Sequence, residues 1–184
     1  MSPKGHERPI VACLHPYLEG RQEEIAKGLY PKHHLWGLES IERTSEWKTE
    51  WIRTIEIQLP GIIEKWFDQT IFRGSPGVKV ELAALQAAKR CDLLYSVCGP
   101  LALVRRFRQA RLVSWVFREP PLTGAGLRLA HAAYRPKRLS SHAGFLCLTP
   151  TAEEAFRKFA PSSFLPWCVD LDLFDGKPAK TTPE

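Results

Sequence analysis

Short apolar runs alternate along the chain with stretches whose apolar residues repeat at helical spacing. The apolar runs are of strand length, and turn or helix signals follow them. We expect strands at residues 10–14, 34–38, 92–97, 112–117, 144–148 and 164–167. We expect helices at residues 19–29, 60–72, 78–90, 101–107, 125–138 and 149–159.

The segment 38–58 has the least regular pattern. It is rich in charge, and Trp47 and Trp51 stand four residues apart, which would place them on one side of a possible helix. Further along, the residues from Gly74 to Gly77 predict a turn.

Alternating strands and helices, with strands that are apolar on both faces, predict an α/β fold. We expect a Rossmann-like, doubly wound parallel sheet flanked by helices, in a single domain. A chain of 184 residues suits one such domain. Residues 1–9 are expected to form an N-terminal tail, residues 10–174 the domain and residues 175–184 a polar linker or tail. Sheets of this kind bind ligands beyond the carboxyl ends of their strands, so the loops there are the places to search.

Charge adds a preference for anionic partners. The chain has 26 lysines and arginines against 20 acidic residues, a formal net charge of +6. The predicted helix at 125–138 is basic and is either a solvated face or a contact with anionic lipid. The N-terminus has no signal-peptide pattern, so we expect a cytoplasmic protein, with peripheral contact at the inner face of the membrane as an option. Nucleic-acid binding is not expected, because no basic and aromatic recognition module is present.

Several chemical motifs are absent from the sequence. The five cysteines include no CxxC pair and are expected to be reduced thiols, mostly in the core. The six histidines lack metal-ligand spacing, so no metal site is expected. The chain also lacks the GxGxxG, P-loop and GxSxG patterns, which argues against a standard dinucleotide site, a P-loop enzyme and a serine hydrolase.

The loop after the first strand contains His15, Glu19, Gly20 and Arg21, and all four are candidate substrate contacts. A glycine before a helix lets the backbone approach a ligand, and free amides there favour an anion. The alternative is a plain turn with a solvated Arg21.

Later strands are followed by Gly99, by the pair Arg118 and Glu119, and by Thr149 at the start of a helix. Arg118 is suited to binding phosphate or carboxylate. Glu119 would act as a base if burial raised its pKa. The alternative is an ordinary exposed loop with two opposite charges.

The last third of the chain carries a family resemblance. A strand ending in Thr149 is followed by a helix to Pro161, and then by Pro166-Trp-Cys-Val-Asp170 and Phe174. This arrangement resembles the end of the N-terminal domain of GT-B glycosyltransferases of family 4, and the resemblance spans about residues 10–174. The chain departs from the family where Glu19-Gly20 replaces a Gly-Gly pair and where Arg118-Glu119 replaces a histidine.

The resemblance implies the acceptor-side half of an enzyme of carbohydrate metabolism. Such an enzyme moves a sugar from a nucleotide-sugar donor, its substrate, to a hydroxyl acceptor and needs no further cofactor. We expect the donor-binding C-terminal domain to lie outside this sequence, so this half is expected to be inactive alone and to partner that domain or a separate chain. The acceptor would be a sugar or a lipid-linked sugar. For such an enzyme half, the positions after the strands lead us to expect catalytic roles for Arg118 and Glu119 and substrate contacts from His15, Glu19, Gly20, Arg21, Gly99 and Thr149.

Three alternatives remain at this point. The chain is one subunit of a split transferase, or it is a non-catalytic glycan- or nucleotide-binding or regulatory module that has kept only the fold. The third alternative, outside the glycosyltransferases, is a flavodoxin-like or other nucleotide-binding α/β module. In either of the transferase forms, the surface around Trp167, Val169 and Phe174 should be apolar and should face the second domain.

Overall fold

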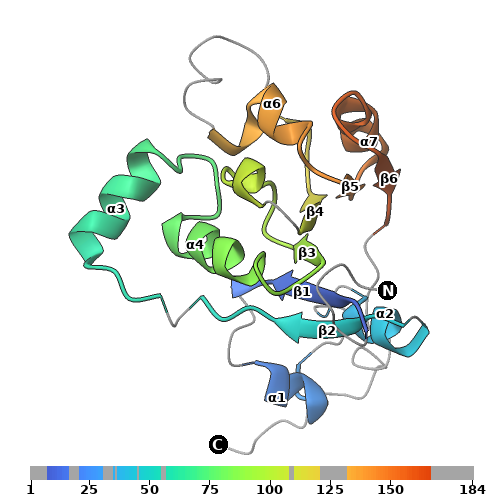
Figure 1. The fold of residues 1–184 in the computed structure, drawn as a ribbon. Coiled ribbons are helices and arrows are strands. Elements are labelled where there is room, and N and C mark those ends of the chain that lie inside the picture. Colours follow the sequence, from blue (N-terminus) through green and yellow to red (C-terminus); the bar gives the residue numbers. More distant parts are fainter. Residues whose placement is uncertain are drawn as a thin grey trace, which may run out of the picture.

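The computed structural model describes residues 8–16, 21–30, 35, 37–44, 46–54, 57–107, 110–120 and 132–166. Within these ranges six strands form one all-parallel sheet in the order β2-β1-β3-β4-β5-β6 (Figure 1). The prediction of a doubly wound parallel α/β fold is confirmed. The strands are β1 (Ile10–Leu14), β2 (Lys48–Trp51), β3 (Leu93–Ser96), β4 (Arg111–Val116), β5 (Gly144–Cys147) and β6 (Ser162–Phe164).

Helices cover the sheet on both faces. The α-helices are α1 (Gln22–Ala26), α2 (Leu38–Thr44), α3 (Gly61–Thr70), α4 (Val78–Ala87), α6 (Pro136–Leu139) and α7 (Pro150–Arg157). Short 3-10 helices are η3 (Val104–Arg106) and η4 (Ala132–Tyr134). On one face α4 packs on β1 and β3, and α6 and α7 pack on β4 and β5, whereas α2 packs on the other face. None of the helices in the described ranges is long and apolar enough to cross a membrane.

The central strands form where the apolar runs are densest. All five residues of β1 are buried, because β1 lies inside the sheet with helices on both faces. On one face Ala12 and Leu94 meet Val80 and Ala84 of α4. On the other face Val11 belongs to the cluster that contains Leu38 of α2.

The strand order creates a switch point between β1 and β3. From β1 the chain first crosses to β2 on one side and later returns to β3 on the other side. The loops after β1 and β3 therefore leave in opposite directions, which is where doubly wound sheets bind ligands. The order 2-1-3-4-5 is that of flavodoxin-like sheets, and it is also the Rossmann order without the outer third strand. The strand order is therefore compatible with a Rossmann-like domain and with a flavodoxin-like module.

Glu81, in the first turn of α4, is fully buried. Its carboxylate accepts hydrogen bonds from the backbone amides of Ala102 at 2.6 Å and Leu103 at 2.9 Å, and from the Ser75 hydroxyl. Burial raises the pKa of Glu81, and the three hydrogen bonds act in the opposite direction. One carboxylate thus joins the turn after α3, the start of α4 and the loop after β3.

The prediction for the segment 34–58 is wrong. Residue 34 lies outside the described residues, Leu38 begins helix α2 rather than ending a strand, and the second strand is β2, where a helix was expected. Trp47 and Trp51 do lie in one apolar cluster. Because four is an even number, this spacing also places two residues on the same side of an extended strand.

The predicted basic helix at 125–138 is not continuous. Residues 121–131 lie outside the described part of the chain, and Arg135 has extended backbone before Pro136 begins the short helix α6. A proline at the first position of a helix is favourable, whereas a proline inside a helix breaks it.

Strand β1 has the predicted bounds, and most other predicted elements are present with bounds that are shorter or shifted by a residue. The last strand lies at Ser162–Phe164 and shares only one residue with the predicted strand 164–167. Of the predicted helix 101–107, only residues 104–106 are helical, as a 3-10 turn.

Replacing Glu81 with glutamine is predicted to destabilise the fold. The amide would turn a donor toward backbone N–H groups that now meet an acceptor, leaving a buried polar group unsatisfied. We expect the free energy of unfolding, measured by urea denaturation, to fall by about 1–3 kcal/mol. The same change at exposed Glu154 is the control and should leave it nearly unchanged. Equal stability of the two variants would contradict this role of Glu81.

His142 is a buried histidine held in the neutral form. Its ring stacks on Phe145 with centroids 4.7 Å apart, and its Nδ1 donates to the Arg138 carbonyl at 3.0 Å. Nε2 is buried and has no hydrogen-bond partner among the described residues. Burial is the main cause that lowers the pKa of His142 to about 4.

This shift predicts a loss of stability in acid. The unfolded chain binds the proton near pH 6.5 and the folded chain near pH 4, so the contribution is complete above pH 6.5 and is lost as the pH falls to about 4. Its full size is about 3 kcal/mol. In urea denaturation at a series of pH values, His142→Phe, which keeps the stacking, should lose that part of the pH dependence. A variant as sensitive to pH as the wild type would refute the assignment.

Candidate functional site at the carboxyl edge of the sheet

The ends of β4 and β5 bring three of the predicted site residues to one place. β4 and β5 are neighbours in the sheet, with Val116 opposite Cys147, so the residues that follow them leave the same edge. Arg118 and Glu119 follow β4, and Thr149 follows β5 as the N-cap of α7.

The polar groups at this edge are hydrogen bonded to one another. The Thr149 hydroxyl oxygen accepts from the Ala152 amide at 3.1 Å, which makes Thr149 the N-cap of α7, and lies 3.2 Å from the Thr151 hydroxyl oxygen. The Thr151 hydroxyl donates to the Glu119 carboxylate. Glu119, Thr149 and Thr151 therefore form one connected group, which we call the rim cluster.

Glu119 does not have the environment of a general base with a raised pKa. Its side chain is exposed, and the Thr151 hydroxyl, followed by the backbone amide of Glu119 itself, lowers its pKa. The condition under which Glu119 would act as a base, a pKa raised by burial, is not met in this structure. The carboxylate is instead a hydrogen-bond acceptor that stays ionised into acid.

Arg118 is exposed beside the rim cluster and is close enough to Tyr134 to affect it electrostatically. Burial raises the pKa of the Tyr134 phenol, and the positive charge of Arg118 partly offsets this. The guanidinium is therefore available at the surface to pair with an anion.

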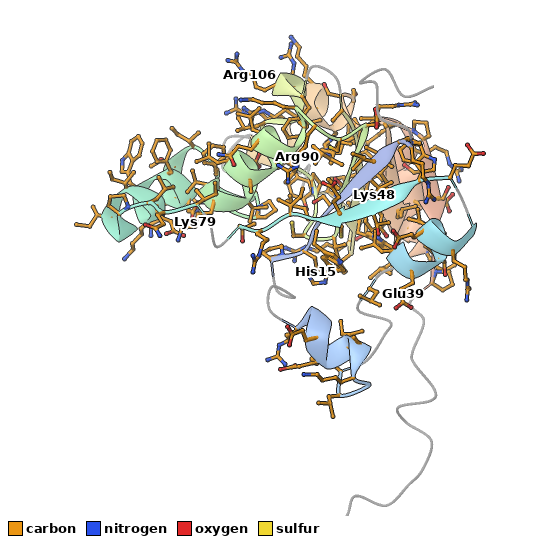
Figure 2. The ribbon with its side chains drawn as sticks, turned by 60° about the horizontal axis from the view of Figure 1, so that its bottom comes forward. His15, Glu39, Lys48, Lys79, Arg90 and Arg106 are labelled. Atoms are coloured by element: carbon orange, nitrogen blue, oxygen red, sulfur yellow. The ribbon has the colours of Figure 1, made fainter. Side chains whose placement is uncertain are left out.

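The switch point between β1 and β3 holds two more predicted residues. Gly99 has φ of +102°, in the region that favours glycine, and its carbonyl accepts from the Ser96 hydroxyl at 2.6 Å. His15 directly follows β1, where its ring is buried with its centroid 6.4 Å from that of Trp51 (Figure 2). This surrounding makes His15 part of the packing at the end of β1.

Arg21 is not turned toward these residues. Its guanidinium pairs with Glu24 at 3.1 Å and lies 5.0 Å from the centre of the Tyr30 ring. Both partners belong to α1 or the turn after it, so Arg21 matches the alternative of a surface arginine. Glu19 and Gly20, the other candidates in this loop, lie outside the described residues.

Sequence reasoning missed an apolar row beside the rim cluster. The backbone ladder continues past the strands, since Leu148 N donates to the Val116 carbonyl at 3.1 Å and Leu165 N donates to the Cys147 carbonyl at 2.8 Å. Phe117, Leu148 and Leu165 therefore stand in line across the ends of β4, β5 and β6. Phe117 is 46% exposed and Leu165 is 44% exposed. The signal was present, because Phe117 and Leu148 end the predicted strands 112–117 and 144–148, and Leu165 lies in the predicted strand 164–167.

The cysteines in the described ranges do not have the environment of reactive thiolates. Cys13, Cys91, Cys98 and Cys147 are not joined in disulfides. Burial raises the pKa of Cys98 to about 12 and that of Cys147 to about 11, so both stay protonated at neutral pH. No group of three His, Cys, Asp or Glu residues within the described ranges could hold a metal ion. The apolar surface predicted around Trp167, Val169 and Phe174 falls on residues outside these ranges.

Removing the Thr151 hydroxyl is predicted to raise the pKa of Glu119. Thr151→Val deletes the main donor to the carboxylate, so the pKa should return toward its ordinary range, as followed by an NMR titration of the side-chain carboxyl carbon. Thr49→Val is a matched control, because it removes a hydroxyl that donates to Glu42 at 3.1 Å. An unchanged Glu119 pKa in Thr151→Val would show that the rim cluster is not connected in solution.

Comparison of the chain with models of protein families, with curated proteins and with solved structures finds no match. The resemblance to GT-B glycosyltransferases of family 4 therefore rests on the sequence pattern alone.

Proposed function

We propose that the chain is the acceptor-binding half of a glycosyltransferase and that the carboxyl edge of its sheet binds the hydroxyl acceptor. The observation that supports this most is the rim cluster with Arg118 beside it, at the neighbouring ends of β4 and β5. The nucleotide-sugar donor would be bound by a second domain or chain that joins this edge.

The groups of the rim suit a sugar. The ionised Glu119 carboxylate can accept hydrogen bonds from sugar hydroxyls, and threonine hydroxyls can both donate and accept. The exposed Arg118 can pair with a phosphate, whether on a lipid-linked acceptor or on the donor. In this arrangement Glu119 orients the acceptor hydroxyl by hydrogen bonding.

The apolar row supports the second half of the proposal. Phe117 and Leu165 are exposed at the same edge, and so is Phe164, which is 42% exposed at the end of β6. Exposed apolar side chains that gather at one edge mark surfaces that meet another body. A donor-binding domain placed over this edge would cover the row and exclude water from the rim cluster.

A non-catalytic nucleotide-binding module is the second candidate. The strand order and the switch point between β1 and β3 favour it, because doubly wound sheets bind nucleotides at this point. Its site would be Gly99 and the loop after β1, rather than the rim cluster. The two candidates therefore predict different ligands and different sensitive residues.

Ligand-observed saturation-transfer NMR on the whole chain tests the proposal. The probes are methyl glycosides of common hexoses and uridine diphosphate glucose. We expect the glycosides to receive saturation, and Arg118→Ala and Glu119→Gln to weaken this signal several-fold because both side chains line the rim. The controls Arg106→Ala and Glu154→Gln remove similar exposed charges elsewhere and should retain the signal.

Each other outcome decides against the proposal. Binding of the nucleotide sugar without the glycosides, unaffected by Arg118→Ala, would support the nucleotide-binding module. Glycoside binding that survives both rim variants would place the site elsewhere. Absence of any signal from the glycosides would refute acceptor binding by this chain.

A further inference from the structure

Helix α3 turns most of its apolar side chains away from the protein, and only Phe67 packs against the buried cluster that contains Phe72 and Val78. Ile62 is 87% exposed and Trp66 is 55% exposed, and Ile63 and Ile71 are also exposed. No residue of α3 is buried. Figure 1 shows the helix at the periphery of the molecule, beyond α4 and away from the sheet. Packing against the core therefore explains Phe67 but not the exposed apolar positions Ile62, Ile63 and Trp66.

Polar contacts fix which side of α3 faces outward. Glu64 pairs with Lys79 of α4 at 2.7 Å, and Asp68 Oδ1 accepts from the Val78 amide at 2.6 Å. Glu64 and Asp68 share one side of the helix, and Ile62 and Trp66 share the opposite side. The helix is thus held to α4 by its acidic side, which leaves its apolar side to solvent.

The charges left on the outer surface of α3 are positive. Both acidic side chains of the helix are engaged with α4, whereas Lys65 in the helix and Arg73 in the turn after it are exposed. The whole chain also carries a formal net charge of +6. An anionic partner would meet these cations favourably.

We propose that α3 docks on the anionic surface of a lipid bilayer, with Ile62, Ile63 and Trp66 entering the interfacial region and Lys65 and Arg73 contacting lipid phosphates. Helices that lie in the membrane interface combine an apolar side containing tryptophan or leucine with flanking lysine or arginine. Tryptophan is favoured at the level of the headgroups. The inference does not depend on the proposed function.

A bilayer fits this surface better than a second copy of the chain does. Two copies meeting through α3 would bring Lys65 and Arg73 of each close to those of the other, between molecules that are both positively charged. A helix of 10 residues is about 15 Å long, and α3 stands at the edge of the molecule (Figure 1). A helix in this position can enter the surface of a bilayer without a matching groove on a protein partner.

Vesicle flotation with the whole chain tests the inference. We use vesicles of phosphatidylcholine alone and vesicles with about one-third phosphatidylglycerol. The wild type should float with the anionic vesicles and several-fold less with the neutral ones or in about 0.5 M salt. Ile62→Ser combined with Trp66→Ser should reduce flotation about tenfold, because the apolar contacts are lost. Lys65→Gln combined with Arg73→Gln should remove the preference for anionic vesicles.

Leu29→Ser is the matched control, since Leu29 is an equally prominent apolar side chain, 73% exposed, outside α3. It should float like the wild type. Circular dichroism should be the same for all variants, because each replaced side chain is exposed. A wild type that stays with the soluble fraction, or a double serine variant that floats like the wild type, would overturn the proposal. So would a dimer in light scattering that the serine changes dissociate.

Discussion

The buried carboxylate of Glu81 holds together parts of the chain that the sheet alone would not join. A buried charge is costly unless hydrogen bonds surround it, and Glu81 meets two backbone amides and one hydroxyl. Those partners belong to the loop after β3 and to the turn after α3. The position of the switch-point loop, with Gly99 in it, therefore depends on the helix that precedes β3 as much as on β3 itself.

The interior of the sheet was predictable because its strands are buried on both faces. In β1 and β3 such burial requires nearly continuous apolar residues, such as Ala12 and Leu94, and a short apolar run is easy to recognise. The edge strand β2 has Lys48 and Glu50 among its four residues and is only partly covered. Its sequence carries no such run. The spacing of four residues between Trp47, just before β2, and Trp51, at its end, fits a helix and a strand equally.

The sequence predicted three of the residues at the carboxyl edge of the sheet, but it did not predict the protonation state of Glu119. Parallel strands place their following residues at one edge, so Arg118, Glu119 and Thr149 were expected together. The protonation behaviour of Glu119 was not, because it depends on Thr151 reaching the carboxylate from the first turn of α7. That contact depends on the angle at which the helix leaves β5, which no local sequence pattern specifies.

Helix α3 illustrates what periodicity leaves open. A helical repeat of apolar residues predicts that one side of the helix is apolar. It does not predict whether protein, lipid or water covers that side. In this chain the side is selected by Glu64 and Asp68, which bind α4. The turn after α3 carries Ser75, which donates to Glu81, and Glu81 holds the loop after β3. A surface bound by α3 would therefore hold the carboxyl edge, and any acceptor on it, at a set position relative to the lipid.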